Sequence, residues 1–138
     1  MNNLFKIGFF GDGIWAHNVL KLLILDKSIK MCFICARLST KDKILKKIAD
    51  KKKIKFFKLR NVNNKKFIEY IKKNKINLLV SMSYDQIFKT PIINSVKKKI
   101  INCHAGKLPF YRGRSVLNWV LINGEKDFGI TTHFINKK

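Results

Sequence analysis

Short apolar stretches alternate along the chain with segments whose apolar residues recur at helical spacing. Residues 78–82 form a solidly apolar run, which is typical of a strand buried on both faces of a parallel sheet. In residues 15–25, by contrast, Ala16, Leu20 and Leu23 fall on one side of a helix. The alternation of these two patterns predicts a sheet with helices packed against it.

The expected strands and helices follow one another in regular order. Strands are expected at residues 4–10, 31–36, 54–59, 78–82, 100–103 and 128–135. Helices are expected at residues 15–25 and 43–49, from the Asn63-Asn64 cap through Ile71, in a short segment at Pro91, and at residues 115–122. We therefore expect an α/β fold of three layers, built on a mostly parallel central sheet.

The composition is that of one globular domain of 138 residues with a core of its own. Its longest apolar stretches are far shorter than the ~18 residues that cross a bilayer, and its N-terminus lacks the pattern of a secretory signal. We therefore expect no membrane partner and a cytoplasmic location. The three cysteines, odd in number and too few for a disulfide framework, favour the same compartment.

Two of the cysteines, Cys32 and Cys35, have the spacing of a metal-binding or redox pair. They lie within the apolar run 31–36, where small buried thiols are ordinary strand residues. No second Cys or His pair accompanies them at ligand spacing, so we expect no metal site.

The formal net charge is +22 at pH 7, which draws the chain toward phosphate-bearing partners. Residues 41–60 could bind RNA through counterion release. The lysines are nevertheless spread over the whole chain, and Arg, the better reader of bases, is scarce. A general preference for Lys, Ile and Asn would give the same pattern, so the charge permits a nucleic-acid partner without requiring one.

Asn102 and His104 lie two residues apart at the end of an apolar run, and in a strand they point to the same face. Gly106, Pro109 and Gly113 follow directly and indicate a loop. The pair therefore lies where a strand ends, and open α/β sheets bind ligands just beyond the carboxyl ends of their strands.

An amide beside an imidazole is suited to chemistry at a carbonyl carbon. Asn102 can donate to an oxygen on which negative charge develops, and His104 can donate or accept the proton that moves. The alternative is a hydrogen-bonded polar edge of the sheet with no catalytic role.

A turn with two glycines, Gly11 and Gly13, follows the first expected strand. It could bring backbone close to a phosphate at the start of the helix, but the third glycine of the dinucleotide-binding motif is missing. Tight-turn geometry explains both glycines equally well. Trp15, just beyond the turn, is either part of the core or pocket wall or a stacking platform.

The run from Asn102 to Gly113 resembles the signature of the 10-formyltetrahydrofolate-dependent formyltransferases. This family includes methionyl-tRNA formyltransferase, glycinamide ribonucleotide formyltransferase and the nucleotide-sugar N-formyltransferases. The resembling residues are Asn102-Cys103-His104, Leu108-Pro109 and Tyr111-Arg112-Gly113, with further similar stretches at residues 10–16, 81–87, 113–119 and 129–133. Residues 10–16 and 113–119 are most similar to the nucleotide-sugar enzymes.

The resemblance implies a Rossmann-like formyltransferase domain and direct formyl transfer from 10-formyltetrahydrofolate, the co-substrate, to a primary amine. The expected acceptor is a nucleotide-linked amino sugar; methionyl-tRNA is the alternative, and a non-catalytic folate- or nucleotide-binding module is a second one. Asn102 and His104 are the implied catalytic residues, and Gln86, Ile87 and Phe88 would hold the folate.

Six further residues are candidates for binding the acceptor: Gly11, Gly13, Trp15, Lys107, Tyr111 and Arg112. Arg112 suits a phosphate because its guanidinium binds such groups in a bidentate manner, but it could equally brace the loop. His133, among threonines on the last expected strand, is expected to be structural.

The family's third catalytic residue is an Asp in an Asp-Thr-Gly-like turn, expected just beyond Lys138. The resemblance therefore implies that residues 1–138 are the N-terminal catalytic domain, truncated at its C-terminal end, with weakened folate binding and severely reduced turnover. A C-terminal domain, which in full-length relatives helps to bind the acceptor or to form a homodimer, is not expected within these residues.

Overall fold

The structure is a computed structural model that describes residues 4–136. Its strands are β1 (Phe5–Gly11), β2 (Ile29–Ala36), β3 (Lys55–Lys58), β4 (Leu78–Met82), β5 (Ile100–His104) and β6 (Thr131–Phe134). Its helices are α1 (Gly13–Leu25), α2 (Ile44–Lys51), α3 (Lys65–Lys73), α4 (Thr90–Ile93) and α5 (Val116–Ile122). The expected approach to an Asp-containing turn falls partly on Lys137 and Lys138, which lie outside the described residues.

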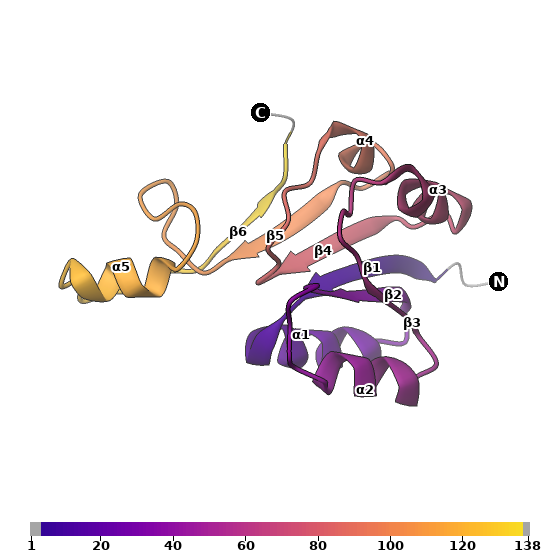
Figure 1. Cartoon of the computed structure of the whole chain (residues 1–138), viewed down its shortest axis with the longest axis horizontal. Coiled ribbons are helices and arrows are strands. Elements are labelled where there is room, and N and C mark those ends of the chain that lie inside the picture. The colour runs from indigo at the N-terminus through magenta and orange to yellow at the C-terminus, as the bar shows by residue number, and fades with distance from the viewer. Residues whose placement is uncertain (1–3, 137–138) are drawn as a thin grey trace.

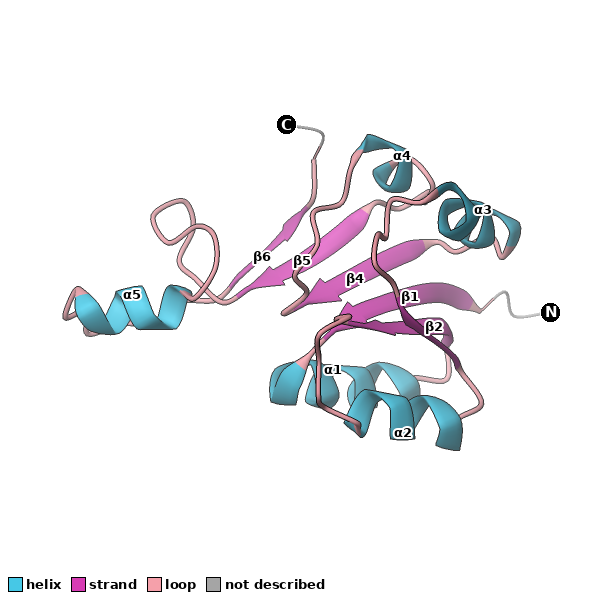
Figure 2. Cartoon of the chain, viewed as in Figure 1, coloured by secondary structure: helices cyan, strands magenta, loops and turns pink. Residues whose placement is uncertain are grey.

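The six strands form one sheet in the order β3-β2-β1-β4-β5-β6, and only the pairing of β6 with β5 is antiparallel. In Figure 1, α1 and α2 lie on one face of this sheet and α3 and α4 on the other, while α5 extends beyond the carboxyl end of β5. Figure 2 shows the strands as a single layer between the two helical layers. The predicted three-layer, mostly parallel α/β fold is thereby confirmed. None of the helices described is long and apolar enough to cross a membrane.

Local signals explain several element boundaries. The Asn64 side chain caps α3 by accepting a hydrogen bond from the Phe67 amide at 2.9 Å, as the sequence predicts. At the start of α2, Asp42 accepts from the Ile44 amide at 2.7 Å. Thr40, in the same expected capping segment, accepts from the Asp42 amide at 3.1 Å, and its hydroxyl also donates to Asp12 on the neighbouring turn.

Two apolar clusters fill the spaces between the layers. The cluster under α1 and α2 contains Phe9 and Leu20, and the cluster under α3 and α4 is rich in aromatic side chains. Phe10 lies at the centre of the second cluster, with ring centroids 4.9 to 6.0 Å from four neighbours: Phe33, Phe67, Tyr84 and Phe88. Offset and edge-on aromatic pairs of this kind add stability beyond the area they bury.

The register of the sheet leads from this core to a polar edge. One row of paired residues crosses all six strands: Phe57, Cys35, Phe10, Ser81, Asn102 and His133. Paired residues in neighbouring strands point to the same face. On β5 that face changes from the fully buried Ile100 to Asn102 and then His104. Ile100, which closes the core, therefore lies on the same face of the sheet as Asn102 and His104, and the three residues alternate along β5.

The close packing between β1 and its neighbours predicts a strong effect of Gly8→Ala. A Cβ at Gly8 would lie 2.3 Å from the Phe33 ring and 2.7 Å from Leu79 Cδ2, and both side chains are fully buried. We expect a loss of about 1–3 kcal/mol in the free energy of unfolding, measured by urea denaturation. Lys21→Ala, on the exposed side of α1, is the control and should change it by less than about 0.5 kcal/mol. Equal stability of the two variants would contradict this packing.

Candidate active site

A cavity of about 610 Å³ opens at the carboxyl edge of the sheet. It is lined by the ends of β4 and β5, by β6, by the segments after β1 and β2 and by the start of α5. It lies where the strand order reverses between β1 and β4, which is the usual ligand position in open α/β sheets. Its size is within the range of small-molecule sites.

Asn102 lines this cavity and is held by His133 on the adjacent strand. The two residues are register partners, and Asn102 Nδ2 lies 3.3 Å from His133 Nε2. His133 Nδ1 lies 3.1 Å from the Phe134 carbonyl oxygen, which can only accept, so Nδ1 carries the proton and Nε2 accepts from Asn102 in the neutral ring. This arrangement fixes the Asn102 amide and leaves its second N–H for a ligand.

His104 lines the same cavity and is held from behind by a backbone carbonyl. Its Nε2 lies 2.6 Å from the Tyr111 carbonyl oxygen, so Nε2–H donates and Nδ1 of the neutral ring is free to accept a proton. Gly106 permits this contact, because a Cβ there would lie 2.6 Å from that oxygen and 2.7 Å from His104 Nε2. The loop after β5 therefore sets both the orientation and the tautomer of His104.

The three residues predicted to hold the folate all line the cavity, but in different ways. The side-chain amide of Gln86 makes hydrogen bonds within the protein: it accepts from the Val62 amide at 2.9 Å and donates to the Leu59 carbonyl at 2.7 Å. Phe88 is buried against Phe10. Ile87 is 82% exposed and offers an apolar surface at the mouth. Gln86 therefore braces the wall, and Ile87 presents the side chain that a planar ligand could cover.

Of the three residues expected at the first turn, only Trp15 lines the cavity. Gly11 ends β1, where a Cβ would lie 2.8 Å from Ala16 Cβ. Gly13 begins α1 with φ +77°, a left-handed conformation that favours glycine. Turn geometry and close packing thus account for both glycines.

The three candidates from the loop after β5 do not join the main cavity. Lys107 and Tyr111 line a separate opening of about 350 Å³, where the Tyr111 hydroxyl donates to Glu125 at 2.6 Å. Arg112 is exposed, and its Nε donates to the Pro109 carbonyl at 3.0 Å. Arg112 therefore braces its own loop here, the alternative that the sequence left open, and Tyr111 acts on the site through its carbonyl.

Several cavity residues were not among the sequence candidates. Arg37 and Arg114 bring positive charge to the lining, and Ser83 and Ser115 add hydroxyls. Both serines have left-handed backbone, with φ of 53° and 55°, a strained conformation that is frequent at binding sites. The sequence signal that could have identified Arg37 as a cavity residue is its position directly after a strand, at the carboxyl edge of the sheet. His133 was predicted to be structural because it lies among threonines on a strand; in the structure it lines the cavity and contacts Asn102.

The thiols of β2 face the protein interior. Burial raises the pKa of the Cys35 thiol to about 11 and also raises the pKa of Cys32. Burial likewise raises the pKa of the Tyr84 hydroxyl, which lies 3.5 Å from Cys35 Sγ. Within residues 4–136, no three His, Cys, Asp or Glu side chains gather as a metal site would require.

Known sequences similar to this chain include a polymyxin resistance protein and methionyl-tRNA formyltransferases. Over 94 residues the chain is 45% identical to the bifunctional polymyxin resistance protein ArnA of Wigglesworthia glossinidia brevipalpis, covering 68% of this chain and 14% of that protein. Over 140 residues it is 33% identical to the methionyl-tRNA formyltransferase of Clostridium tetani, covering 96% of this chain and 45% of that enzyme. The chain thus spans less than half the length of these curated relatives.

Solved structures share the fold at low sequence identity. Glycinamide ribonucleotide transformylase 1 from Symbiobacterium toebii superposes with a TM-score of 0.78 at 16% identity, covering 98% of this chain and 68% of that one. A formyltetrahydrofolate deformylase from Pseudomonas syringae pv. tomato gives 0.77 at 13% identity, covering 99% of this chain and 47% of that one.

The sequence model of the family described as formyl transferase matches residues 27–138, which include β2 through β6 and the cavity residues on them. Together with the shared fold, this match shows that the chain belongs to the formyl transferase family.

Proposed function

We propose that this chain is the catalytic portion of an enzyme that transfers a formyl group from 10-formyltetrahydrofolate to a primary amine. The observation that carries the proposal is the convergence of Asn102 and His104 on one cavity, each held by a different partner. The cavity supports the assignment because an apolar wall at Ile87 and Phe88 adjoins these polar groups. A formylated folate matches this arrangement, because its planar ring would lie against the apolar wall and its reactive formyl group near the polar pair.

The chemistry follows from the atoms that remain free. When bound, 10-formyltetrahydrofolate supplies an activated formyl carbon that a neutral amine can attack. The free N–H of Asn102 donates to the formyl oxygen as negative charge develops there. His104 accepts the amine proton at Nδ1, because its Nε2–H is committed to the Tyr111 carbonyl. As the tetrahedral intermediate collapses, the bond between the formyl carbon and the folate nitrogen would break, and His104 would return the proton to that nitrogen.

The acceptor that we favour is the amine of a nucleotide-linked amino sugar. Residues 113–119 resemble the nucleotide-sugar enzymes, and Arg114 to Leu117 of that stretch line the cavity. Methionyl-tRNA is the second candidate, supported by the net charge of +22 and by the names of several relatives, such as the Clostridium tetani enzyme.

The proposal applies to residues 1–138 as the N-terminal catalytic part of the domain. A non-catalytic folate- or nucleotide-binding module is the alternative. Assays should therefore use the longest natural polypeptide that contains the chain. Tight folate binding without formyl transfer to any amine would favour the binding module.

Substitution of the paired side chains tests the catalytic assignment. We expect Asn102→Ala to lower kcat about 10²–10³-fold, and His104→Ala about 10²–10⁴-fold, because each removes a group that acts as charge and proton move. The double variant should lose less than the product of the single losses, since the two residues act together. The measurement is transfer of radiolabelled formyl to amine acceptors.

The matched control for these variants is Asn18→Ala, an exposed amide on α1. It should keep full turnover, and circular dichroism should show equal folding for all variants. Turnover in Asn102→Ala equal to that of Asn18→Ala would remove the catalytic role of the amide.

The tight contact at Gly106 predicts a catalytic loss from a remote methyl group. Gly106→Ala would push His104 and the Tyr111 carbonyl apart, and a displacement of this kind costs about 10²-fold in kcat. Asn18→Ala, at an exposed position on α1 away from this loop, is again the control and should keep full turnover. An NMR shift of the His104 imidazole without any loss of kcat would show that its orientation is not required.

Salt dependence separates the two acceptor classes. A tRNA contacted through 6–10 phosphates would lose roughly 10³–10⁵ in affinity between 50 and 200 mM salt. A nucleotide sugar has few phosphates, so we expect a shallow decrease in affinity, measured by titration of each acceptor over that range. A steep slope together with formylation of methionyl-tRNA would overturn the sugar assignment.

A further inference from the structure

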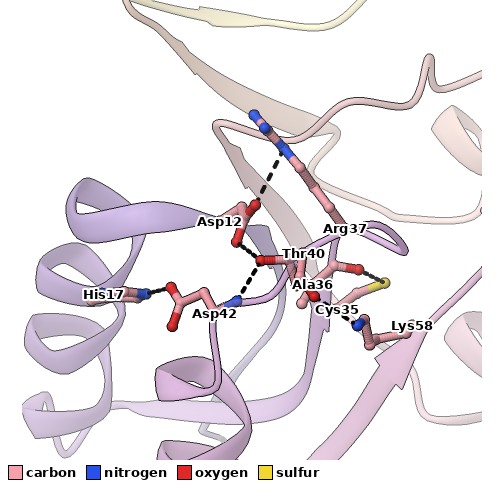
Figure 3. Close-up of polar contacts among 8 residues, drawn as sticks. All are labelled: Asp12, His17, Cys35, Ala36, Arg37, Thr40, Asp42 and Lys58. Carbon is pink, nitrogen blue, oxygen red and sulfur yellow. Dashed lines mark hydrogen bonds and ion pairs between the residues drawn. The ribbon is translucent and has the colours of Figure 1, made fainter.

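Arg37 directly follows Ala36, the last residue of β2, and lines the cavity. It comes from a part of the molecule that contributes no catalytic residue. Figure 3 shows its side chain running past Asp12, with the guanidinium tip beyond the carboxylate and away from Asp42. Its side chain is 32% exposed, so the charge is partly withdrawn from water.

The guanidinium group of Arg37 is poorly satisfied by the protein. Its nearest ionic partner is Asp12 Oδ2, at 3.7 Å from Nε, beyond hydrogen-bond range. Within the described part of the chain, that buried Nε has no hydrogen-bond partner. A guanidinium carries five N–H donors in a planar fork, and a partly buried one requires acceptors for them. An oxyanion could therefore supply acceptors for the donors of this group.

Asp12, the carboxylate beside Arg37, is itself fixed by other contacts. The Thr40 hydroxyl donates to Asp12 Oδ1 at 2.7 Å and accepts from the Asp42 amide at 3.1 Å (Figure 3). His17, buried on α1, contacts the Asp42 carboxylate. These contacts tie the segment after β2 to the start of α1, so the backbone near Arg37 and the carboxylate beside its guanidinium are both anchored before a ligand binds, which limits the entropy lost on binding.

The lining can hold an oxyanion such as phosphate. Arg114 and Ser83 line the same cavity and can add a second charge and a hydroxyl donor. Planar arginine forks bind phosphate in a bidentate manner, and a diphosphate offers enough oxygens for two arginines. A folate also has an anionic end, in its glutamate carboxylates, so the two sources must be separated by experiment.

We propose that Arg37 binds a phosphate group of the acceptor, with Asp12 as the residue that positions it. This assignment rests on the proposed function, because it identifies the acceptor as a nucleotide. Arg37 then selects acceptors that carry a diphosphate. It does so on the side of the cavity near the turn before α1, apart from Asn102 and His104, which act on the formyl group.

The test uses intrinsic fluorescence of Trp15, which lines the same cavity. The chain has two tryptophans, so Trp119→Phe is introduced first to leave Trp15 as the reporter, and calorimetry repeats each titration independently. The probes are UDP, dTDP and inorganic pyrophosphate, with N-(4-aminobenzoyl)-glutamate as the carboxylate probe. We expect Arg37→Gln to weaken UDP binding about tenfold or more, as loss of a charged hydrogen-bond partner does, and Arg37→Lys to weaken it less.

The matched control is Lys41→Gln, which removes one exposed charge from the same segment outside the cavity lining. It should leave the UDP affinity unchanged, and thermal unfolding should be the same for all variants. The assignment is overturned if UDP does not bind at millimolar concentration, if Arg37→Gln binds it normally, or if Lys41→Gln loses as much affinity. It is also overturned if only the carboxylate probe depends on Arg37.

These results remain distinct from those of the formyl-transfer assay. Binding of UDP that depends on Arg37, without formyl transfer to any amine, supports the phosphate site and rejects the transferase assignment. Formyl transfer to a nucleotide sugar with an unchanged KM in Arg37→Gln does the reverse.

Discussion

The register of the central sheet is the constraint on which the site depends. Ser81, Asn102 and His133 are paired across β4, β5 and β6, in the same row as Phe10. A shift of one residue in β5 would turn Asn102 toward the other face and separate it from both neighbours. The apolar residue before this row prevents such a shift, because Ile100 would leave its fully buried position beside Leu79 of β4. Core packing thereby sets the geometry of the polar edge.

The cavity wall is an extension of the aromatic core. Tyr84 and Phe88 stack at a centroid distance of 6.0 Å, and both contact Phe10. Gln86, between them, is hydrogen-bonded to the backbone of Leu59 and Val62, both in the segment joining β3 to α3. These three anchors, at alternate positions, leave Ile87 as the exposed apolar residue of an anchored loop. A fixed apolar surface of this kind suits a planar ligand, because little conformational entropy is lost when it is covered.

Sequence patterns were more informative about where Asn102 and His104 lie in the fold than about the contacts that they and their neighbours make. Strand 78–82 and the position of Asn102 and His104 at a strand end follow from local patterns, and local patterns are what periodicity reports. The partner of Asn102 could not be read in this way, because His133 meets it only through the antiparallel return of β6. Gln86 shows the opposite limit. A polar side chain in a matching motif was expected to face a ligand, yet nearby backbone groups satisfy its amide.

The positive charge of the chain divides into two physically different parts. The lysines on α2, β3 and α3 are exposed, where salt screens them, so they attract polyanions without selecting among them. Arg37 is partly buried, is oriented by Asp12, and faces a cavity. A charge in that setting acts at short range and in one direction, and discrimination between acceptors requires both properties. The net charge of +22 is therefore weak evidence for the acceptor, whereas one arginine at the end of β2 is stronger evidence.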